Sequence, residues 1–321
     1  MALIVNIEKR IGDFHLKTAF EVEAGEIFGL LGESGCGKSM TLKCIAGIET
    51  PDRGRIILNN RILFDSERRI NLIPQKRKVG YLFQDYALFP NMTVEKNIGI
   101  VLRKGERVQD YLEQFYLKGL ENHYPFMLSG GQKQRCALAR MMASKPELLL
   151  FDEPFSAVDK NLKWNLELQV LDLLDQMNKP AIFVTHNKDE IDHLCEKVGI
   201  LSRGQMKEVG AKEDIFRHPK TSASAKLTGC ENVFSVDGGS YSYVGIPQEA
   251  VKLTDSEADA DITGRIERIF REKEETVLII RMKKRIFYYR CQNPVPDRGF
   301  SVGDTIYLGV DKKRIWYLRE S

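Results

Sequence analysis

One octapeptide limits the folds open to this chain more than any other feature. The segment Gly32-Glu-Ser-Gly-Cys-Gly-Lys-Ser39 matches the phosphate-binding pattern G-x-x-x-x-G-K-[ST] in full. An apolar run at residues 26–31 comes directly before it, and apolar residues at helical spacing follow from Met40. The order of strand, glycine-rich loop and helix predicts an α/β fold that binds phosphate groups at this loop.

Each residue type in the loop has a chemical reason. Glycines let consecutive backbone N–H groups turn toward an anion, which a Cβ would obstruct. Lys38 offers a positive charge to the β- and γ-phosphates of a nucleotide, and Ser39 offers a hydroxyl to Mg²⁺. A chance glycine-rich turn is the alternative, and the flanking strand and helix disfavour it. The predicted nucleotide-binding residues of the loop are Gly32, Glu33, Ser34, Gly35, Cys36 (a small filler), Gly37, Lys38, Ser39 and Met40.

Two carboxylates end another apolar run. Residues 148–151 are Leu-Leu-Leu-Phe, and Asp152 and Glu153 follow them directly. A carboxylate at a strand end beside the loop can hold Mg²⁺, which is the role predicted for Asp152, and Glu153 is then placed to act as a general base toward water. A helix cap or a solvated turn is the structural alternative for such a pair. The phosphate loop favours the chemical interpretation.

The rest of the chain indicates two domains. Residues 181–185 form a further apolar run, residues 162–177 have helical spacing between the two runs, and such buried strands are typical of a parallel sheet covered by helices. After about residue 217 this alternation stops, and short strand-like runs separated by turns predict a small β-barrel or sandwich. We place the domains at 1–229 and 230–321. The strand-like runs of the second domain are residues 264–270, 276–281, 285–290, 305–310 and 314–318.

Charge and cysteine usage bear on partners and compartment. The net charge is +3, and residues 231–321 contain 15 Lys+Arg and 15 Asp+Glu, so we expect no nucleic-acid partner. No apolar stretch approaches the roughly 20 residues of a membrane-spanning helix, and the N-terminus lacks a secretory pattern. Six scattered cysteines without metal-ligand spacing favour a reducing compartment. We expect a cytoplasmic protein.

A second anion-binding pattern lies at residues 128–135, Leu-Ser-Gly-Gly-Gln-Lys-Gln-Arg. A serine cap and two glycines at the start of a helix repeat the physics of the first loop. This stretch resembles the signature sequence of ATP-binding-cassette ATPases, and other family motifs follow in order: a glutamine loop at Gln84, the loop Ser-Ala-Val-Asp at 156–159, and a switch histidine at His186. The resemblance implies a P-loop cassette with a helical subdomain at about 85–145. The resemblance also adds residues to the predicted site. Gln84 would join Ser39 and Asp152 as a metal ligand, and His186 would join Glu153 as a catalytic residue. The added nucleotide-binding residues are Gln84, Ser129, Gly130, Gly131, Gln132 and Asp159.

The family mechanism implies a homodimer. Two cassettes close head to tail, with each ATP between Lys38 of one chain and Ser129 of the other, and Glu153 activates water. The residue that contacts adenine is open. Family members place an aromatic residue near Ile11, whereas the nearest aromatic residue here is Phe14. Either Phe14 stacks on the base, or Ile11 gives only apolar contact.

Further resemblance concerns transport. Residues 59–65, 73–79 and 83–91 resemble the molybdate/sulfate branch of importer ATPases. This implies a peripheral subunit on the cytoplasmic face of the membrane, with separate permease subunits and, indirectly, an extracytoplasmic substrate-binding protein. Tyr86, Leu88 and Phe89 are the predicted permease dock, unless they pack internally. Import of ferric iron, polyamine or sugar is the first alternative, and a soluble cassette without a transport role is the second.

The C-terminal region resembles the small OB-like, TOBE-type β-domain that many importer ATPases append. The matching stretches are residues 229–233 and 245–251. Such a domain supports the dimer or senses the cargo. The basic run Arg281, Lys283, Lys284 and Arg285 could attract an oxyanion, and a solvated hairpin turn is the more frequent reason for such a run.

Overall fold

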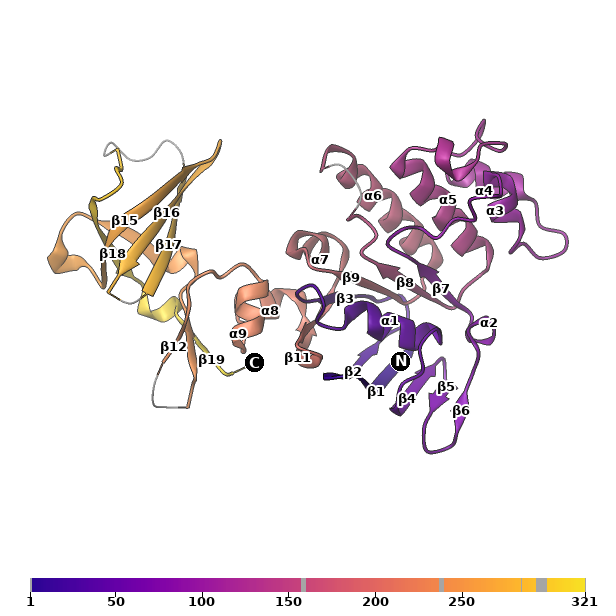
Figure 1. Cartoon of the computed structure of the whole chain (residues 1–321), viewed down its shortest axis with the longest axis horizontal. Helices are drawn as coiled ribbons and strands as arrows, with labels where there is room; N and C mark the ends of the chain where they lie inside the picture. The colour runs from indigo at the N-terminus through magenta and orange to yellow at the C-terminus, as the bar shows by residue number, and fades with distance from the viewer. Residues whose placement is uncertain (1, 157–159, 237–239, 284, 293–298, 321) are drawn as a thin grey trace. The chain divides into compact units, whose positions relative to one another are not determined.

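The computed structural model describes residues 2–156, 160–236, 240–283, 285–292 and 299–320. The chain forms two compact units, Met1–Glu213 and Asp214–Ser321 (Figure 1). The predicted boundary between residues 229 and 230 falls inside the second unit. Helix α9 (Ser222–Leu227) belongs there because it packs on β12 (Val233–Ser235) and β13 (Tyr243–Gly245).

A single sheet of eleven strands organises the described part of the first unit. Its core strands β10, β3, β9, β8 and β7 are mutually parallel, as the sequence predicted. An extension that contains several antiparallel pairs continues the sheet on the β10 side. In sheet order the strands are β6 (Ile70–Asn71), β5 (Arg61–Asp65), β4 (Arg53–Leu58), β1 (Leu3–Ile11), β2 (Phe14–Val22), β11 (Gln205–Ala211), β10 (Lys197–Ser202), β3 (Ile27–Leu31), β9 (Ala181–Thr185), β8 (Leu148–Asp152) and β7 (Val79–Leu82).

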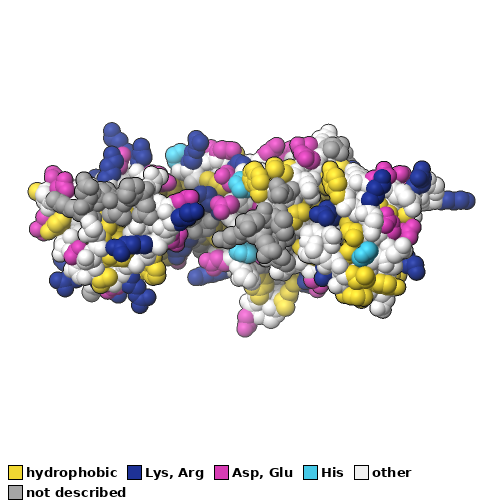
Figure 2. All heavy atoms as spheres, turned by 90° about the horizontal axis from the view of Figure 1, so that it is seen from above, with side chains coloured by type: hydrophobic (Ala, Val, Ile, Leu, Met, Phe, Trp, Pro, Cys, Tyr) yellow, Lys and Arg dark blue, Asp and Glu magenta, His cyan; other side chains and the backbone are white. Residues whose placement is uncertain are grey.

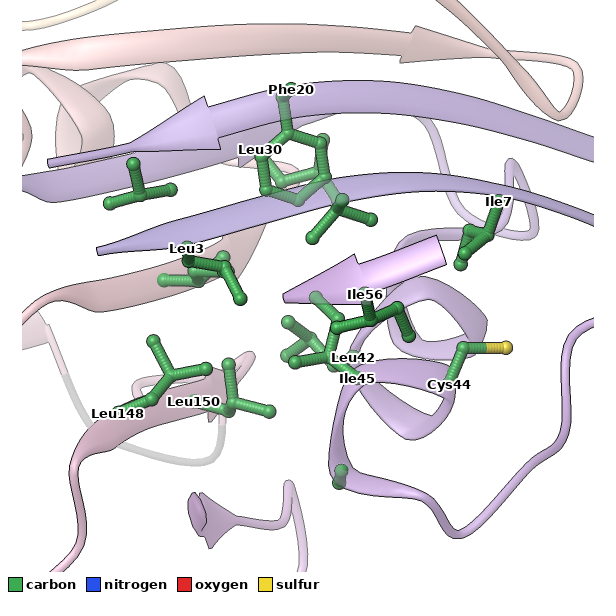
Figure 3. Packing of buried hydrophobic residues seen from close by; sticks show 14 of the residues in the cluster. Leu3, Ile7, Phe20, Leu30, Leu42, Cys44, Ile45, Ile56, Leu148 and Leu150 are labelled. Carbon is green, nitrogen blue, oxygen red and sulfur yellow. The ribbon is translucent and has the colours of Figure 1, made fainter. Parts of the chain in front are cut away.

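The helices cover both faces of the parallel strands. Every residue of β3, β8 and β9 is buried, which explains their uninterrupted apolar sequence. Leu30 of β3 belongs to the same buried cluster as Leu42 of α1 (Figure 3). On the opposite face of the strand, a Cβ on Gly29 would lie 2.5 Å from Cδ1 of Ile191 in α7. The helices up to the division between the units are α1 (Lys38–Ala46), α2 (Pro74–Arg77), α3 (Val94–Gly99), α4 (Val108–Gln114), α5 (Gly130–Ala143), α6 (Lys160–Met177) and α7 (Lys188–Leu194), and α8 (Lys212–Arg217) spans the division.

Helices α3, α4 and α5 form the helical part that was predicted at about residues 85–145. They lie between β7 and β8 in the sequence and are grouped together in Figure 1, where α3 and α4 pack against α5. The N-terminus of α5 is capped by Ser129, so the second anion-binding pattern begins the central helix of this group.

The second unit is built mainly of strands, as predicted. Each strand-like run of the sequence corresponds to a strand, and Val251, Leu278, Phe287 and Leu308 are among the buried residues of its core. The five-stranded antiparallel sheet has the order β14 (Val251–Thr254), β18 (Thr305–Val310), β15 (Ile262–Arg271), β16 (Glu275–Met282) and β17 (Arg285–Gln292), and the three-stranded sheet has the order β12, β13, β19 (Trp316–Leu318).

Candidate functional site

The phosphate loop connects β3 to α1 and depends on its glycines. Gly35 and Gly37 have φ values of 77° and 110°, in the left-handed region that residues with a Cβ avoid. A Cβ on Gly32 would lie 2.3 Å from the backbone oxygen of Leu201. The loop conformation is therefore fixed by residue type at these positions, before any ligand binds.

Lys38 begins α1 with its ammonium group inside the loop. Its Nζ donates to the backbone oxygens of Gly32, at 2.7 Å, and Glu33, at 2.9 Å, and the residue is only 4% exposed. A buried charge needs such partners. The positive charge is consequently held where the glycine-rich backbone turns.

Asp152, at the end of β8, has both carboxylate oxygens occupied. Oδ1 accepts from Ser39 Oγ at 2.7 Å, and Oδ2 accepts from the Tyr81 hydroxyl at 2.8 Å. Burial, followed by the charge of Asp152, raises the pKa of the Tyr81 phenol. The hydroxyl of Ser39 and the carboxylate of Asp152 are oxygen donors of the kind that Mg²⁺ prefers. Gln84 is exposed and, in the described residues, stands outside this hydrogen-bonded set.

Glu153 and His186 come together from the ends of β8 and β9. His186 Nδ1 and Glu153 Oε1 lie 3.3 Å apart. Glu153 has a φ of 47°, which is uncommon for a residue with a side chain, and its N–H donates to Val184 O at 2.9 Å. This backbone geometry turns the chain at Glu153 directly after the buried strand.

The N-terminus of α5 has a reciprocal cap. Ser129 Oγ accepts from the Gln132 N–H at 3.3 Å, and Gln132 Oε1 accepts from the Ser129 N–H at 2.8 Å. Ser129 and Gly130 are exposed, so this helix start is accessible to a ligand or to another protein. Asp159, predicted to contact the nucleotide, lies outside the described residues.

A pocket of about 460 Å³ opens beside the phosphate loop. Phe14 lines it, and the Phe14 ring also lies close to the loop: a Cβ on Gly37 would be 3.0 Å from its Cζ. Ile11 is 47% exposed and does not belong to the lining. Of the two candidates for adenine contact, Phe14 is the one that faces the loop. The described lining residues are Asp13, Phe14, His15, Glu33, Ser34, Gly35, Cys36, Arg203 and Gln205.

The other predicted loop residues differ in how far their side chains are buried. Glu33 and Ser34 are exposed toward the pocket, whereas the side chain of Met40 packs against the hydrophobic core of the unit. Cys36 is buried, and burial raises the pKa of its thiol, which disfavours the reactive thiolate form.

The predicted permease dock is only partly at the surface. Tyr86 is buried at 5% exposure, so internal packing is the correct interpretation for this residue. Phe89 is 44% exposed, and the Arg140 guanidinium lies 5.0 Å from the centre of its ring. Exposed hydrophobic side chains also interrupt the charged surface over the helical part on the face seen in Figure 2, and Ile100 is an exposed residue of this region.

The basic run of the second unit is engaged in local contacts. Arg281 Nε pairs with Glu267 at 2.6 Å, and Arg285 Nη2 donates to Ser235 O at 2.9 Å. Lys284 lies outside the described residues. The contacts of the two arginines favour the hairpin-turn interpretation over an oxyanion site.

Tyr81 is one of the site residues that the sequence analysis missed. It lies three residues before Gln84 and received no role. A polar side chain within an apolar strand was the available signal, but the contact with Asp152 also requires β7 and β8 to be neighbours in the sheet. Arg203 and Gln205, in the pocket lining, were missed for the same reason, because β10 and β11 meet β2 and β3 only in the fold.

Comparison with known proteins places this geometry in a family. A family profile described as "ABC transporter" matches residues 16–156. Over 296 residues the chain is 36% identical to the sulfate/thiosulfate import ATP-binding protein CysA of Synechocystis sp., and the match covers 84% of this chain and 81% of that relative. The chain belongs to the ABC transporter ATPases.

Two further relatives extend the comparison of this ABC ATPase. The spermidine/putrescine import ATP-binding protein PotA of Bacillus cereus is 31% identical, covering 96% of this chain and 95% of that protein. The ATP-binding cassette MJ0796, solved as a dimer in a post-hydrolysis state with ADP and Pi, is 25% identical with a TM-score of 0.56, covering 66% of this chain and 99% of that one. No helix in the described parts of the ATPase is both long enough and apolar enough to cross a bilayer.

Proposed function

We propose that this ATPase binds Mg·ATP at residues 32–39 and uses its hydrolysis to drive an importer. The observation that supports this most directly is the meeting of two side-chain pairs at one edge of the sheet. Ser39 contacts Asp152, and Glu153 contacts His186. Ser39 lies in the first turn of α1, after the loop that follows β3, and the other three residues lie at the carboxyl ends of β8 and β9. Ligands of open α/β sheets bind at this edge.

In the proposed reaction the loop residues bind and orient the phosphates. Lys38 exchanges its carbonyl partners for the β- and γ-phosphate oxygens, which make shorter and stronger charge-assisted bonds. Ser39 and Asp152 hold Mg²⁺, with Gln84 as a further oxygen donor. When bound, Mg²⁺ neutralises charge on the β- and γ-phosphates.

Glu153 is the proposed general base, and His186 its neighbour at the γ-phosphate. The Glu153 carboxylate orients a water molecule and accepts its proton as the water attacks the γ-phosphorus. His186 lies within reach of the same carboxylate and can donate a hydrogen bond to the γ-phosphate. Their 3.3 Å separation supports the proposal that base and phosphate donor act on the same side of the nucleotide.

The site is completed by a second copy of the chain. The exposed, serine-capped start of α5 offers backbone N–H groups and a helix dipole to an anion. In the proposed homodimer this surface, with Ser129, Gly130 and Gly131, covers the γ-phosphate held by Lys38 of the partner. The solved structure of the MJ0796 cassette is a dimer, which supports a homodimer for this chain.

A permease is the proposed membrane partner, which would hold the ATPase at the cytoplasmic face. Exposed Phe89 and Ile100 lie on the helical part, where a groove of about 580 Å³ is lined by residues of α3 and α4. Apolar residues beside a groove suit an interface. An extracytoplasmic binding protein would deliver the cargo to the permease.

For the cargo we propose an oxyanion or a polyamine. The similarity to CysA favours sulfate or thiosulfate, and the resemblance of residues 59–65, 73–79 and 83–91 to the molybdate/sulfate branch keeps molybdate and tungstate among the candidates. The nearly full-length similarity to PotA favours putrescine or spermidine. The ATPase does not contact the cargo in this scheme, so its own site does not distinguish the two classes.

Reconstitution with its permease and binding protein tests the function. ATP hydrolysis in proteoliposomes is measured with sulfate, molybdate, tungstate, putrescine or spermidine, and Glu153→Gln serves as the inactive control. Stimulation by one class alone identifies the cargo. Mg-dependent ATP hydrolysis that no solute of either class stimulates would refute both cargo assignments, and no hydrolysis at all would refute the motor function.

A further inference from the structure

The carboxylate of Asp152 is held from two sides by different elements. Ser39, on the phosphate-loop helix, donates to Oδ1 at 2.7 Å, and Tyr81, on the neighbouring strand β7, donates to Oδ2 at 2.8 Å. Asp152 itself is 6% exposed. Its orientation is therefore set by two hydroxyl groups and leaves little freedom to the side chain.

The Tyr81 ring is fixed in turn. It is half-buried, packs against the hydrophobic core of the unit, and its centre lies 4.3 Å from that of the Phe83 ring. β7 and β8 are parallel neighbours, with Tyr81 opposite Leu150. A rigid aromatic side chain on a paired strand thus places its hydroxyl two residues further along β8, at Asp152.

We propose that Tyr81 is a positioning residue that holds Asp152 in the orientation required to bind Mg²⁺. The inference rests on the proposed function of the site. With Mg²⁺ bound, Ser39 Oγ would offer a lone pair to the ion, and its single proton can still be donated to Oδ1. The Tyr81 hydroxyl would not compete for the ion, because it occupies the opposite oxygen. It gives the carboxylate a second fixed partner, so that the orientation of Asp152 does not depend on Ser39 alone.

A purely structural role for Tyr81 predicts a different outcome. If only its ring mattered, phenylalanine would replace it without effect on Mg²⁺. Hydrogen-bond partners of metal-binding carboxylates characteristically change metal affinity by about 10–100-fold when removed. The hydroxyl, as distinct from the ring, is therefore the group to test.

The test compares Tyr81→Phe with Tyr86→Phe in the full chain. Tyr86 is a matched control: its hydroxyl is also buried, and it has no hydrogen-bond partner in the described part of the chain. The dissociation constant of a fluorescent ATP analogue is measured with excess EDTA and across a Mg²⁺ titration. The Mg²⁺ concentration at half-maximal tightening reports metal affinity independently of turnover.

For Tyr81→Phe we expect this Mg²⁺ midpoint to rise about 10-fold, with binding in EDTA changed less than about twofold. Tyr86→Phe should leave both unchanged. A wild-type midpoint in Tyr81→Phe, or an equal loss in EDTA, overturns the inference. If Tyr81→Phe is too unstable to measure, Tyr81→Met removes the same hydroxyl and is judged by the same two values. Asp152→Asn distinguishes failure of this inference from failure of the proposed metal site. If this variant keeps the wild-type Mg²⁺ midpoint, Asp152 does not bind the metal and the proposed metal site is wrong.

Discussion

Arg77 provides the sharpest test of how the phosphate-loop helix is held in place. It is completely buried, and its guanidinium caps the C-terminal end of α1. Nη1 donates to the carbonyls of Cys44, at 2.8 Å, and Ile45, at 2.9 Å. Nε donates to Leu72 O at 2.7 Å, and Nη2 to Asn71 Oδ1 at 2.8 Å. A cation at this end also complements the helix dipole.

Replacing Arg77 by methionine removes these four bonds and keeps most of the volume. Hydrogen bonds to charged groups contribute about 1.5–3 kcal/mol each, and the relieved desolvation of the guanidinium offsets several kcal/mol of that sum. We expect α1 to lose about 3 kcal/mol of stability. Arg55→Met is the control, because Arg55 makes one partly exposed ion pair, with Asp65, and such pairs contribute about 1 kcal/mol or less.

Native-state hydrogen exchange of peptides that cover α1 measures the free energy of opening of this helix. A second substitution makes the test specific. Gly47 has a φ of 81°, and a Cβ there would lie 2.5 Å from Arg77 Nε. Gly47→Ala therefore destabilises the protein by about 1–2 kcal/mol, because alanine must adopt the left-handed backbone conformation of this position. In addition, its Cβ displaces the guanidinium of Arg77.

The double variant should lose less stability than the sum of the losses of the two single variants, because the clash of the added Cβ with the guanidinium disappears once Arg77 is methionine. We expect a coupling of about 1 kcal/mol or more, the size found for residues in contact. Additive costs, or a loss for Arg77→Met no larger than that for Arg55→Met, would show that the buried guanidinium does not hold the helix.

Three further predictions concern the nucleotide site. Glu153→Gln should lower hydrolysis by about 100-fold or more with ATP binding retained, and ATP should convert the variant to a stable dimer in size-exclusion chromatography; normal turnover contradicts the assignment of the base. Ser129→Arg should leave the dissociation constant of a fluorescent ATP analogue within about twofold in the monomer while it prevents that dimer, because in the proposed site one chain binds the nucleotide through Lys38 and its partner supplies Ser129. Hydrolysis at the wild-type rate in this variant would exclude a shared site. Phe14→Ala should weaken ATP binding by about fivefold through loss of aromatic contact, whereas Ile11→Ala should not change it; the reverse order would move the adenine contact to Ile11.

The local parts of the site could be predicted from the sequence. The glycines of the loop, the carboxylates at the end of β8 and the capped start of α5 each lie within a short segment whose residue types determine its conformation. The parallel strands were also predictable, since strands buried on both faces must be continuously apolar. For these segments the sequence contains most of the structural information.

Contacts between distant segments could not be predicted in the same way. The bond between Tyr81 and Asp152 joins residues 71 positions apart, and it depends on β7 lying at the sheet edge beside β8. The division between the units is another example. The sequence placed the boundary between residues 229 and 230, but α9 belongs to the second unit because it packs on β12 and β13, and Thr221 is paired with Arg319.

The surroundings of Lys38 bear on why the proposed ATP site would need a second copy of the chain. The ammonium already has two carbonyl acceptors, so binding of the phosphates exchanges hydrogen bonds instead of creating them, and the net gain is smaller than the gross strength of the new bonds. The serine-capped start of α5 is exposed and has no such internal acceptor to replace at Gly130 or Gly131 among the described contacts. Its exposed N–H groups are bonded to water, and in the proposed dimer a γ-phosphate on another chain would replace that water with charge-assisted hydrogen bonds and add a favourable interaction with the helix dipole. In this proposal the interaction favours closure of the dimer only while the γ-phosphate is present, which would link hydrolysis to opening.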